Sequence, residues 1–501
     1  MRLVDDRPSL PGEPPRSKPD QQLSAATHRL YDRWGRYGDS ASEFYTTFRY
    51  SLLPGLGPEP GVTRRDPTAV VHAAGCFHAW YTRRAGGDRD AGNQAHTART
   101  QRWDVAAYDW DLAEIWHATS ADGITWREEG RAVARGPRDA FDGRSVFTPG
   151  ILVWRGRYYL YYQAVRYPYG TRTRNVVGMA WADTPQGPWH RHGEPVLTPG
   201  TPGEWRGDDD GNAVTRYGAW DSHKVHDPQP LVRGGKVWLY YKGQPMGWGT
   251  GGDGGIGWGV ATADCPEGPF VKSPLNPVTN SGHETLLFPY REGVAAICNH
   301  DGPEKDTVQY APDGLNFEVK AHVVLPPPAG APYAPDLFTD NGDGRGITWG
   351  LAHLAREELK SGNSYLVRFD CNLSRDRERP GFRRSNHRFP ETVYFSPDLL
   401  FTGATAPETR PAHTARPSHR RPGAGAGANS GRYEPDRAGT GPEPPTAPVA
   451  AGAHRCGPAA VPAAAAAPDA AAAPAAAAAV SYTHSRAHAV SYTHQRAHVA
   501  G

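Results

Sequence analysis

The chain has 501 residues, a formal net charge of +2, 58 glycines, 48 prolines, 15 tryptophans and 23 tyrosines. This length allows a large buried core, and the nearly balanced charge argues against nucleic acid or an anionic membrane surface as a partner. The abundance of glycine, proline and aromatic residues is typical of a turn-rich β protein with aromatic clefts. The five cysteines lie far apart without a CxxC pair, so they do not predict a disulfide framework.

The N-terminal segment, residues 1–20, is proline-rich and polar, which predicts disorder. It lacks the apolar core of a secretory signal, and no apolar run in the sequence approaches membrane-spanning length. We therefore expect a cytoplasmic enzyme with no membrane partner. A mis-assigned start codon is the alternative.

Residues 21–58 are predicted to form a short helical arm. Leu23, Ala26, Leu30 and Trp34 recur at helical spacing, and Ser24 is suited to cap the start of the helix. So short a helix is not stable alone, so we expect it to pack against another surface.

Residues 59–400 carry one pattern that returns five times. A polar residue opens a strand, a glycine-bearing turn follows, and a run of aromatic and aliphatic residues comes next. The copies begin at Arg65, Thr148, His226, His283 and Pro335. A repeat of this length predicts an all-β fold, a five-bladed β-propeller.

The residues that open the innermost strands of a propeller face its central channel. We therefore expect one polar pocket to be formed by Asp66, Thr148, Asp227, His283 or Glu284, and Asp336. Asp66 and Asp227 each precede a proline, which disfavours the α region, so both are expected to be extended with their carboxylates aimed into the channel. An Asp-Pro pair that merely starts a strand is the alternative for either position.

Two carboxylates and an acid in one pocket are what an inverting glycoside hydrolase requires. One carboxylate activates water on one face of the sugar, and the acid protonates the leaving oxygen on the other. Carboxylates near His283 would raise the pKa of its imidazole and keep it able to donate a proton.

With these residues the chain resembles glycoside hydrolase family 117, the α-1,3-L-neoagarooligosaccharide hydrolases, over about residues 20–400. The segment SAATHR from Ser24 matches the family's SxAxxR motif, which implies an arm exchanged between two subunits of a homodimer. The resemblance implies that Asp66 is the general base, that Asp227, preceded by His226, modulates pKa values, and that His283 is the general acid. Glu284 beside it is the alternative acid.

The resemblance implies sugar contacts for two residues, and further candidates come from the sequence itself. Thr148 and Gln163 match positions that touch the sugar in the −1 subsite. Trp116, next to a polar loop, could stack on a sugar face, although most tryptophans in strand patterns are core residues. Arg65 and Arg144 could donate hydrogen bonds to sugar hydroxyls.

The implied reaction is exo-acting removal of 3,6-anhydro-L-galactose from the non-reducing end of neoagarobiose and its longer homologues, with inversion. A different propeller glycosidase, such as an arabinosidase or a galactofuranosidase, is the second hypothesis, and a non-catalytic sugar-binding propeller is the third. No cofactor is expected to be required. A central divalent cation stays open, since related propellers often hold one but the sequence shows no dedicated ligand cluster.

Residues 401–501 are rich in alanine, proline, glycine and arginine and end in a tandem repeat, VSYTHSRAHA and VSYTHQRAHV. The repeat looks like a translated sequencing adapter, and the stretch before it looks like a frame-shifted reading frame. We interpret this tail as an artefact and assign it no function; a natural low-complexity tail is the alternative.

Overall fold

The computed structural model describes residues 42–375, apart from 87–100, 208–210, 248–256, 300–301, 303 and 356–362. These residues contain strands and turns but no helix, and therefore no helix that could cross a membrane. The all-β expectation is confirmed. The predicted arm residues 21–41, the N-terminal residues 1–20 and the tail 401–501 lie outside this described part.

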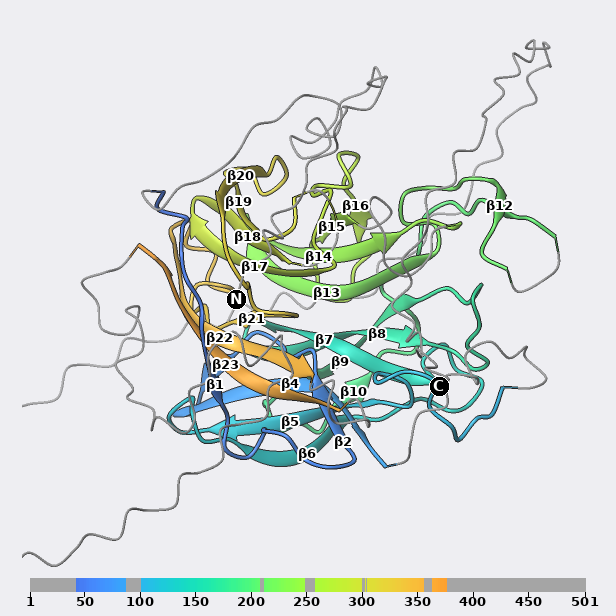
Figure 1. Ribbon diagram of the computed structural model, residues 1–501, viewed down its shortest axis with the longest axis horizontal. Coiled ribbons are helices and arrows are strands. Elements are labelled where there is room, and N and C mark those ends of the chain that lie inside the picture. The colour runs from blue at the N-terminus through green and yellow to red at the C-terminus, as the bar shows by residue number, and fades with distance from the viewer. Residues whose placement is uncertain are drawn as a thin grey trace, which may run out of the picture. The chain divides into compact units, whose positions relative to one another are not determined.

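The first half of the described chain forms antiparallel sheets built in chain order (Figure 1). One sheet contains β2 (Val62–Arg65), β4 (Cys76–Ala85), β5 (Glu114–Ser120) and β6 (Arg127–Val133), with β3 (Val71–Ala73) paired to β4. The next contains β7 (Ser145–Trp154), β8 (Arg157–Val165), β9 (Val176–Ala182) and β10 (His190–Arg191). A small hairpin follows, formed by β11 (Glu204–Trp205) and β12 (Val214–Arg216).

The second half repeats this plan. One sheet contains β13 (Lys224–Arg233), β14 (Lys236–Gln244), β15 (Gly257–Ala263) and β16 (Val271–Lys272). The last sheet has eight strands: β17 (Glu284–Arg291), β18 (Gly293–Asn299), β19 (Thr307–Ala311), β20 (Glu318–His322), β21 (Ala331–Pro332), β22 (Gly344–Ala355), β23 (Ser364–Ser374) and β1 (Arg49–Leu52). Its two halves are joined where β17 pairs with β22 through Tyr290↔Arg345 and Arg291↔Gly344.

The strand β8 shows why these sheets stack. Its sequence, RYYLYYQAV, is aromatic and aliphatic on both faces, and successive side chains of a strand point to opposite faces. Tyr159 and Tyr161 join the apolar cluster shared with β13 to β15, whereas Leu160 and Tyr162 join the cluster shared with β4 and β5. A sheet that is apolar on both faces is covered by a neighbour on each side. On one side that neighbour is the sheet of β13, and β7 and β13 lie side by side (Figure 1).

The end of the predicted arm belongs to the β-structure instead. Residues 42–58 contain no helix, and β1 pairs antiparallel with β23 through Arg49↔Asp370 and Leu52↔Val367. Phe48 and Tyr50 are buried in the largest apolar cluster. The prediction of a helical arm reaching residue 58 is therefore wrong over residues 42–58. The alternation of Phe48, Tyr50 and Leu52 instead suits a strand that pairs with the edge of a sheet.

Candidate active site

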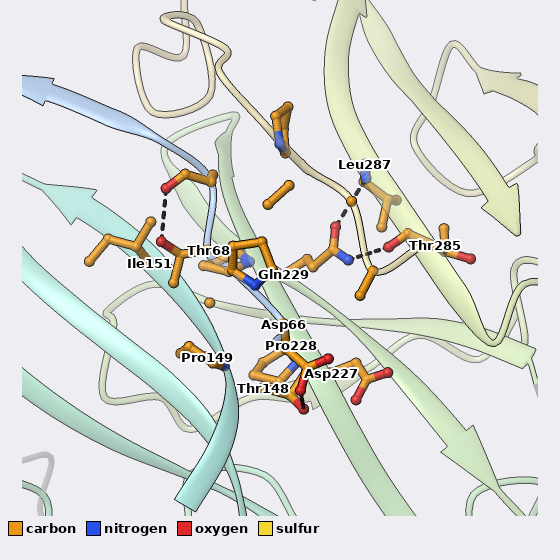
Figure 2. A pocket seen from close by; sticks show the side chains of 18 of the residues that line it. Asp66, Thr68, Thr148, Pro149, Ile151, Asp227, Pro228, Gln229, Thr285 and Leu287 are labelled. Carbon is orange, nitrogen blue, oxygen red and sulfur yellow. Dashed lines mark hydrogen bonds between the residues drawn. The ribbon is translucent and has the colours of Figure 1, made fainter. Parts of the chain in front are cut away.

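The candidate site is a pocket lined by the first strands of successive sheets (Figure 2). It encloses about 600 Å³ of unfilled space, part of it open to solvent. Its polar lining includes Asp66, Thr148, Asp227, Glu284 and Thr285. Figure 2 shows Asp66, Thr148 and Asp227 gathered together, with Pro149, Ile151 and Leu287 along the rest of the wall. Of the five repeat-opening positions that were predicted to meet in one pocket, four line it, through Asp66, Thr148, Asp227 and Glu284.

The backbone at three of these positions is unusual. Asp66, Thr148 and Asp227 have φ angles of 50°, 46° and 52°, in the left-handed region that non-glycine residues seldom adopt. Each precedes a proline, and the pairing register shifts between Phe147 and Pro149 and between His226 and Gln229. The expectation of extended backbone was wrong here. An irregularity of this kind re-aims a side chain away from the sheet faces, and such local strain is characteristic of functional sites.

Asp66 is buried and held by four side chains. Its Oδ2 accepts a charged hydrogen bond from Arg65 Nε at 2.8 Å and hydrogen bonds from the hydroxyls of Thr82 and Thr148 at 3.2 Å each. His353 Nδ1 lies 3.3 Å from Oδ1. Burial opposes ionisation, but Arg65 and then His353 outweigh it and hold the pKa of the Asp66 carboxyl well below its usual range. Asp66 is thus an ionised carboxylate, as a general base must be.

Asp227 and Glu284 share one lysine. Lys242 Nζ forms an ion pair with Asp227 Oδ2, and it also lowers the pKa of the nearby Glu284. Burial, with a contribution from Glu284, nevertheless raises the pKa of Asp227. For Glu284 burial is outweighed by Lys242, His283 and His353, so its pKa is lowered. The pocket therefore gives its carboxyl groups different pKa values. Asp66 and Glu284 are ionised, and Asp227 is the one that most readily holds a proton.

The predicted acid His283 lies just before β17 and does not itself line the pocket. Its side chain is 32% exposed, and its Nε2 lies 3.8 Å from Glu284 Oε1, whereas the Glu284 side chain is 13% exposed. Glu284 lines the pocket directly and His283 sits beside it. Both candidate acids are therefore near the carboxylates.

Gln163 and His226 also belong to this region. Both are buried, and Gln163 Nε2 lies 3.4 Å from His226 Nδ1. His226 Nδ1 is 4.0 Å from Asp227 Oδ1. Burial, followed by Lys242 and Lys224, holds the pKa of His226 well below its usual range, so the ring is neutral.

Two other candidates have structural partners instead. The Arg83 guanidinium covers the ring of Trp116 at 4.0 Å, and Trp116 packs against a core cluster rather than lining the pocket. Arg144 is fully buried, with an ion pair to Asp111 at 2.6 Å and hydrogen bonds to three backbone carbonyls of residues 102–105. It anchors the segment that follows β4.

Asp336 does not join the pocket either. Its carboxylate pairs with Arg345 at 2.7 Å and accepts the Arg345 backbone N–H at 2.9 Å. The equivalent contribution from the last repeat is His353, on β22. The prediction for Asp336 was wrong because the fifth repeat starts with an irregular segment, 333–343, before its long strand.

Sequence reasoning missed Lys242, Thr82 and His353. Lys242 ends the apolar run VWLYY of β14, and His353 interrupts the apolar run of β22. A charged or titratable residue inside an apolar strand needs a partner when it is buried, and that signal could have identified both. Among the residues described, no group of three or more His, Cys, Asp or Glu side chains is arranged to hold a metal ion.

Comparison with known proteins points to glycoside hydrolases. The family model described as glycosyl hydrolases family 43 matches residues 105–207. A solved structure, Zg3597, a family 117 glycoside hydrolase from the marine bacterium Zobellia galactanivorans, is 42% identical in sequence with a TM-score of 0.58. That alignment covers 70% of this chain and 97% of the other.

Other solved structures are more distant. A GH43_1 enzyme from Xanthomonas citri complexed with xylotriose is 14% identical, with 62% of this chain and 88% of the other covered and a TM-score of 0.39. Fructan 1-exohydrolase IIa from Cichorium intybus is 12% identical, with 65% and 57% covered and a TM-score of 0.40. No curated protein matches the chain.

Proposed function

Because this chain belongs to glycoside hydrolase family 117, we propose that it removes 3,6-anhydro-L-galactose from the non-reducing end of neoagarobiose and longer neoagarooligosaccharides, with inversion. That it is a glycoside hydrolase rests on the family. The observation that supports the mechanism is the pocket itself, which Asp66, held ionised, lines together with Glu284, the neighbour of His283.

In the proposed reaction Asp66 takes a proton from the attacking water. Arg65, Thr82 and Thr148 hold its Oδ2, which leaves Oδ1, near His353, to face the water. As the water attacks the anomeric carbon, the bond to the leaving oxygen breaks and that oxygen takes a proton from the acid. In inverting enzymes the base and the acid stand about 6.5–9.5 Å apart, which leaves room for the water.

We assign the acid to His283, with Glu284 orienting its ring. Glu284 is held ionised and lies 3.8 Å from His283 Nε2, so it is suited to accept a hydrogen bond rather than to donate the proton. Asp227, paired with Lys242, modulates the charge of the same region. The role of Thr148, Gln163 and His226 is to contact the sugar, with Arg65 shared between the sugar and Asp66.

We further propose the architecture and assembly that go with this function. The four sheets that begin at β2, β7, β13 and β17, together with β21 to β23 and β1, are interpreted as five blades of a propeller. An arm within residues 21–41 would bridge two subunits of a homodimer. We propose that the enzyme is cytoplasmic and needs no cofactor.

A second candidate is an arabinosidase-type activity, favoured by the family 43 model that matches residues 105–207. A substrate screen separates the two. The purified protein is incubated with neoagarobiose, aryl arabinofuranosides and aryl galactofuranosides, and the released sugar is identified. Release of 3,6-anhydro-L-galactose supports the first proposal, whereas cleavage of an aryl glycoside alone supports the second.

A further inference from the structure

The hairpin of β13 and β14, which contains Asp227, has polar side chains on one of its faces. Lys224 and His226 are two residues apart on β13, so they point to one face of the sheet. His226 pairs directly with Lys242, and Lys224 pairs directly with Gln244, on β14. Directly paired residues share a face, so all four side chains lie on the same side of this hairpin.

Lys224 is a buried cation for which the described part of the chain supplies no counter-ion. It is 7% exposed, and its ammonium donates one hydrogen bond, to the Tyr169 hydroxyl at 3.3 Å. Among the described residues no carboxylate forms an ion pair with it, and Asp227, three residues along the chain, is paired with Lys242. An ammonium buried in this way is costly unless an anion or further acceptors reach it.

His226 offers a second unused group beside it. Its Nε2 is buried and has no hydrogen-bond partner, while its Nδ1 faces the amide of Gln163 at 3.4 Å. When the amide donates to Nδ1, the neutral ring must carry its proton on Nε2. His226 then presents an N–H donor on the same face as the Lys224 ammonium.

We propose that Lys224, assisted by His226, binds an oxyanion on the substrate, a sulfate ester or a carboxylate carried by a sugar next to the bond that is cleaved. Lys224 precedes Asp227 by three residues, which places their Cα atoms roughly 10 Å apart along the strand, about the reach of a neighbouring sugar and its substituent. This inference rests on the proposed glycosidase function and extends its substrates to neoagarooligosaccharides that carry an acidic substituent.

The protonation of Lys224 agrees with such a role. Burial, and then the charge of Lys242, lowers the pKa of Lys224 to about 8. The groups around it are Lys242 on β14, Tyr169 after β8, and His223 and His226 on its own segment. None is an anion, so a bound oxyanion would raise the pKa of Lys224 and binding near pH 8 would take up a proton.

The test is calorimetric titration of the full-length protein with sodium sulfate or sodium acetate, at an ionic strength held constant with chloride. Saturable binding of sulfate assigns a sulfate ester, and saturable binding of acetate assigns a carboxylate. Lys224→Met should weaken that binding by roughly tenfold to a hundredfold, the worth of a charged hydrogen bond. Lys236→Met, which removes an exposed lysine paired with Asp264, should bind as the unaltered protein does.

Two results would overturn the inference: no saturable binding of either anion by the unaltered protein, or equal binding by Lys224→Met. If Lys224→Met does not fold, the pH dependence of anion binding by the unaltered protein is the test. Its anion affinity should fall as the pH rises through about 8, because Lys224 then loses its charge. An affinity that does not change with pH refutes the role of Lys224. Anion binding needs no turnover. If no glycoside is cleaved but the anion binds at Lys224, the proposed reaction fails and the anion site stands.

Discussion

His353 Nδ1 lies 3.3 Å from Asp66 Oδ1 and 3.2 Å from the backbone nitrogen of the same residue. One ring nitrogen cannot accept the backbone N–H and donate to the carboxylate at the same time, so the two contacts alternate with the position of the imidazole proton. Asp66 and His353 are 287 residues apart in the sequence. His353, from the last repeat, thus contacts the proposed general base Asp66, from the first repeat, and it is a positioning residue for Asp66.

Replacing Asp66 by Asn should abolish turnover and leave binding intact. The amide keeps the size of the carboxylate but cannot accept the proton of water, so kcat should fall by at least about 10²–10⁴-fold. Substrate affinity is measured by calorimetry beside the rate. Asp264→Asn, at an exposed carboxylate, is the matched control. A near-normal kcat in Asp66→Asn would remove Asp66 from the role of base.

The acid limb of the pH–rate profile should move when the neighbours of Asp66 are changed. Arg65 and His353 lower the pKa of Asp66 against its burial, so activity should persist well below the ordinary Asp range. Arg65→Met or His353→Leu should raise that pKa and shift the acid limb of kcat/KM to higher pH. Arg157→Met, at a more exposed arginine, should not shift it. An unmoved limb in both variants would show that another group controls it.

The identity of the acid is tested with two leaving groups. His283→Ala should lower the rate about 10²–10⁴-fold on a substrate with a poor leaving group, the usual contribution of general acid catalysis. The loss should be far smaller with an activated aryl leaving group that needs no proton. Glu284→Gln on the same two substrates is the comparison. If only Glu284→Gln shows the leaving-group dependence, Glu284 is the acid.

The stereochemistry of the reaction should be inverting. Asp66 is proposed to activate water directly, so no covalent sugar intermediate forms and the first product has the opposite anomeric configuration. A proton NMR time course, recorded faster than the product interconverts, reads the first anomer. Retention of configuration would instead require a carboxylate nucleophile.

Truncation of the N-terminus should separate assembly from folding. Removal of residues 1–41 should give a folded monomer if the proposed arm holds two subunits together. Removal of residues 1–52 should also lower the melting temperature, because β1 then leaves β23 and Phe48 and Tyr50 leave the core. Light scattering and thermal unfolding measure both. An intact protein that is monomeric at micromolar concentration would refute the arm exchange.

Much of the candidate site could be predicted from the sequence. The recurring pattern of polar residue, turn and apolar run placed Asp66, Thr148, Asp227 and Glu284 at equivalent positions, and equivalent positions of a repeat meet in space. Residue type and position in the repeat are local properties, so they can be read directly. The all-β class follows from the same local pattern.

Other features depended on the tertiary structure. The left-handed backbone of Thr148 and Asp227 arises where each strand departs from regular pairing, and this register is a property of the sheet. His353 and Lys242 acquire their roles only through groups brought to them by folding. Asp336, whose place in the repeat suggested the pocket, instead pairs with Arg345. Local sequence determines which chemical groups a chain carries, whereas burial and distant partners determine their charge and orientation, because electrostatic interactions depend on separation in space.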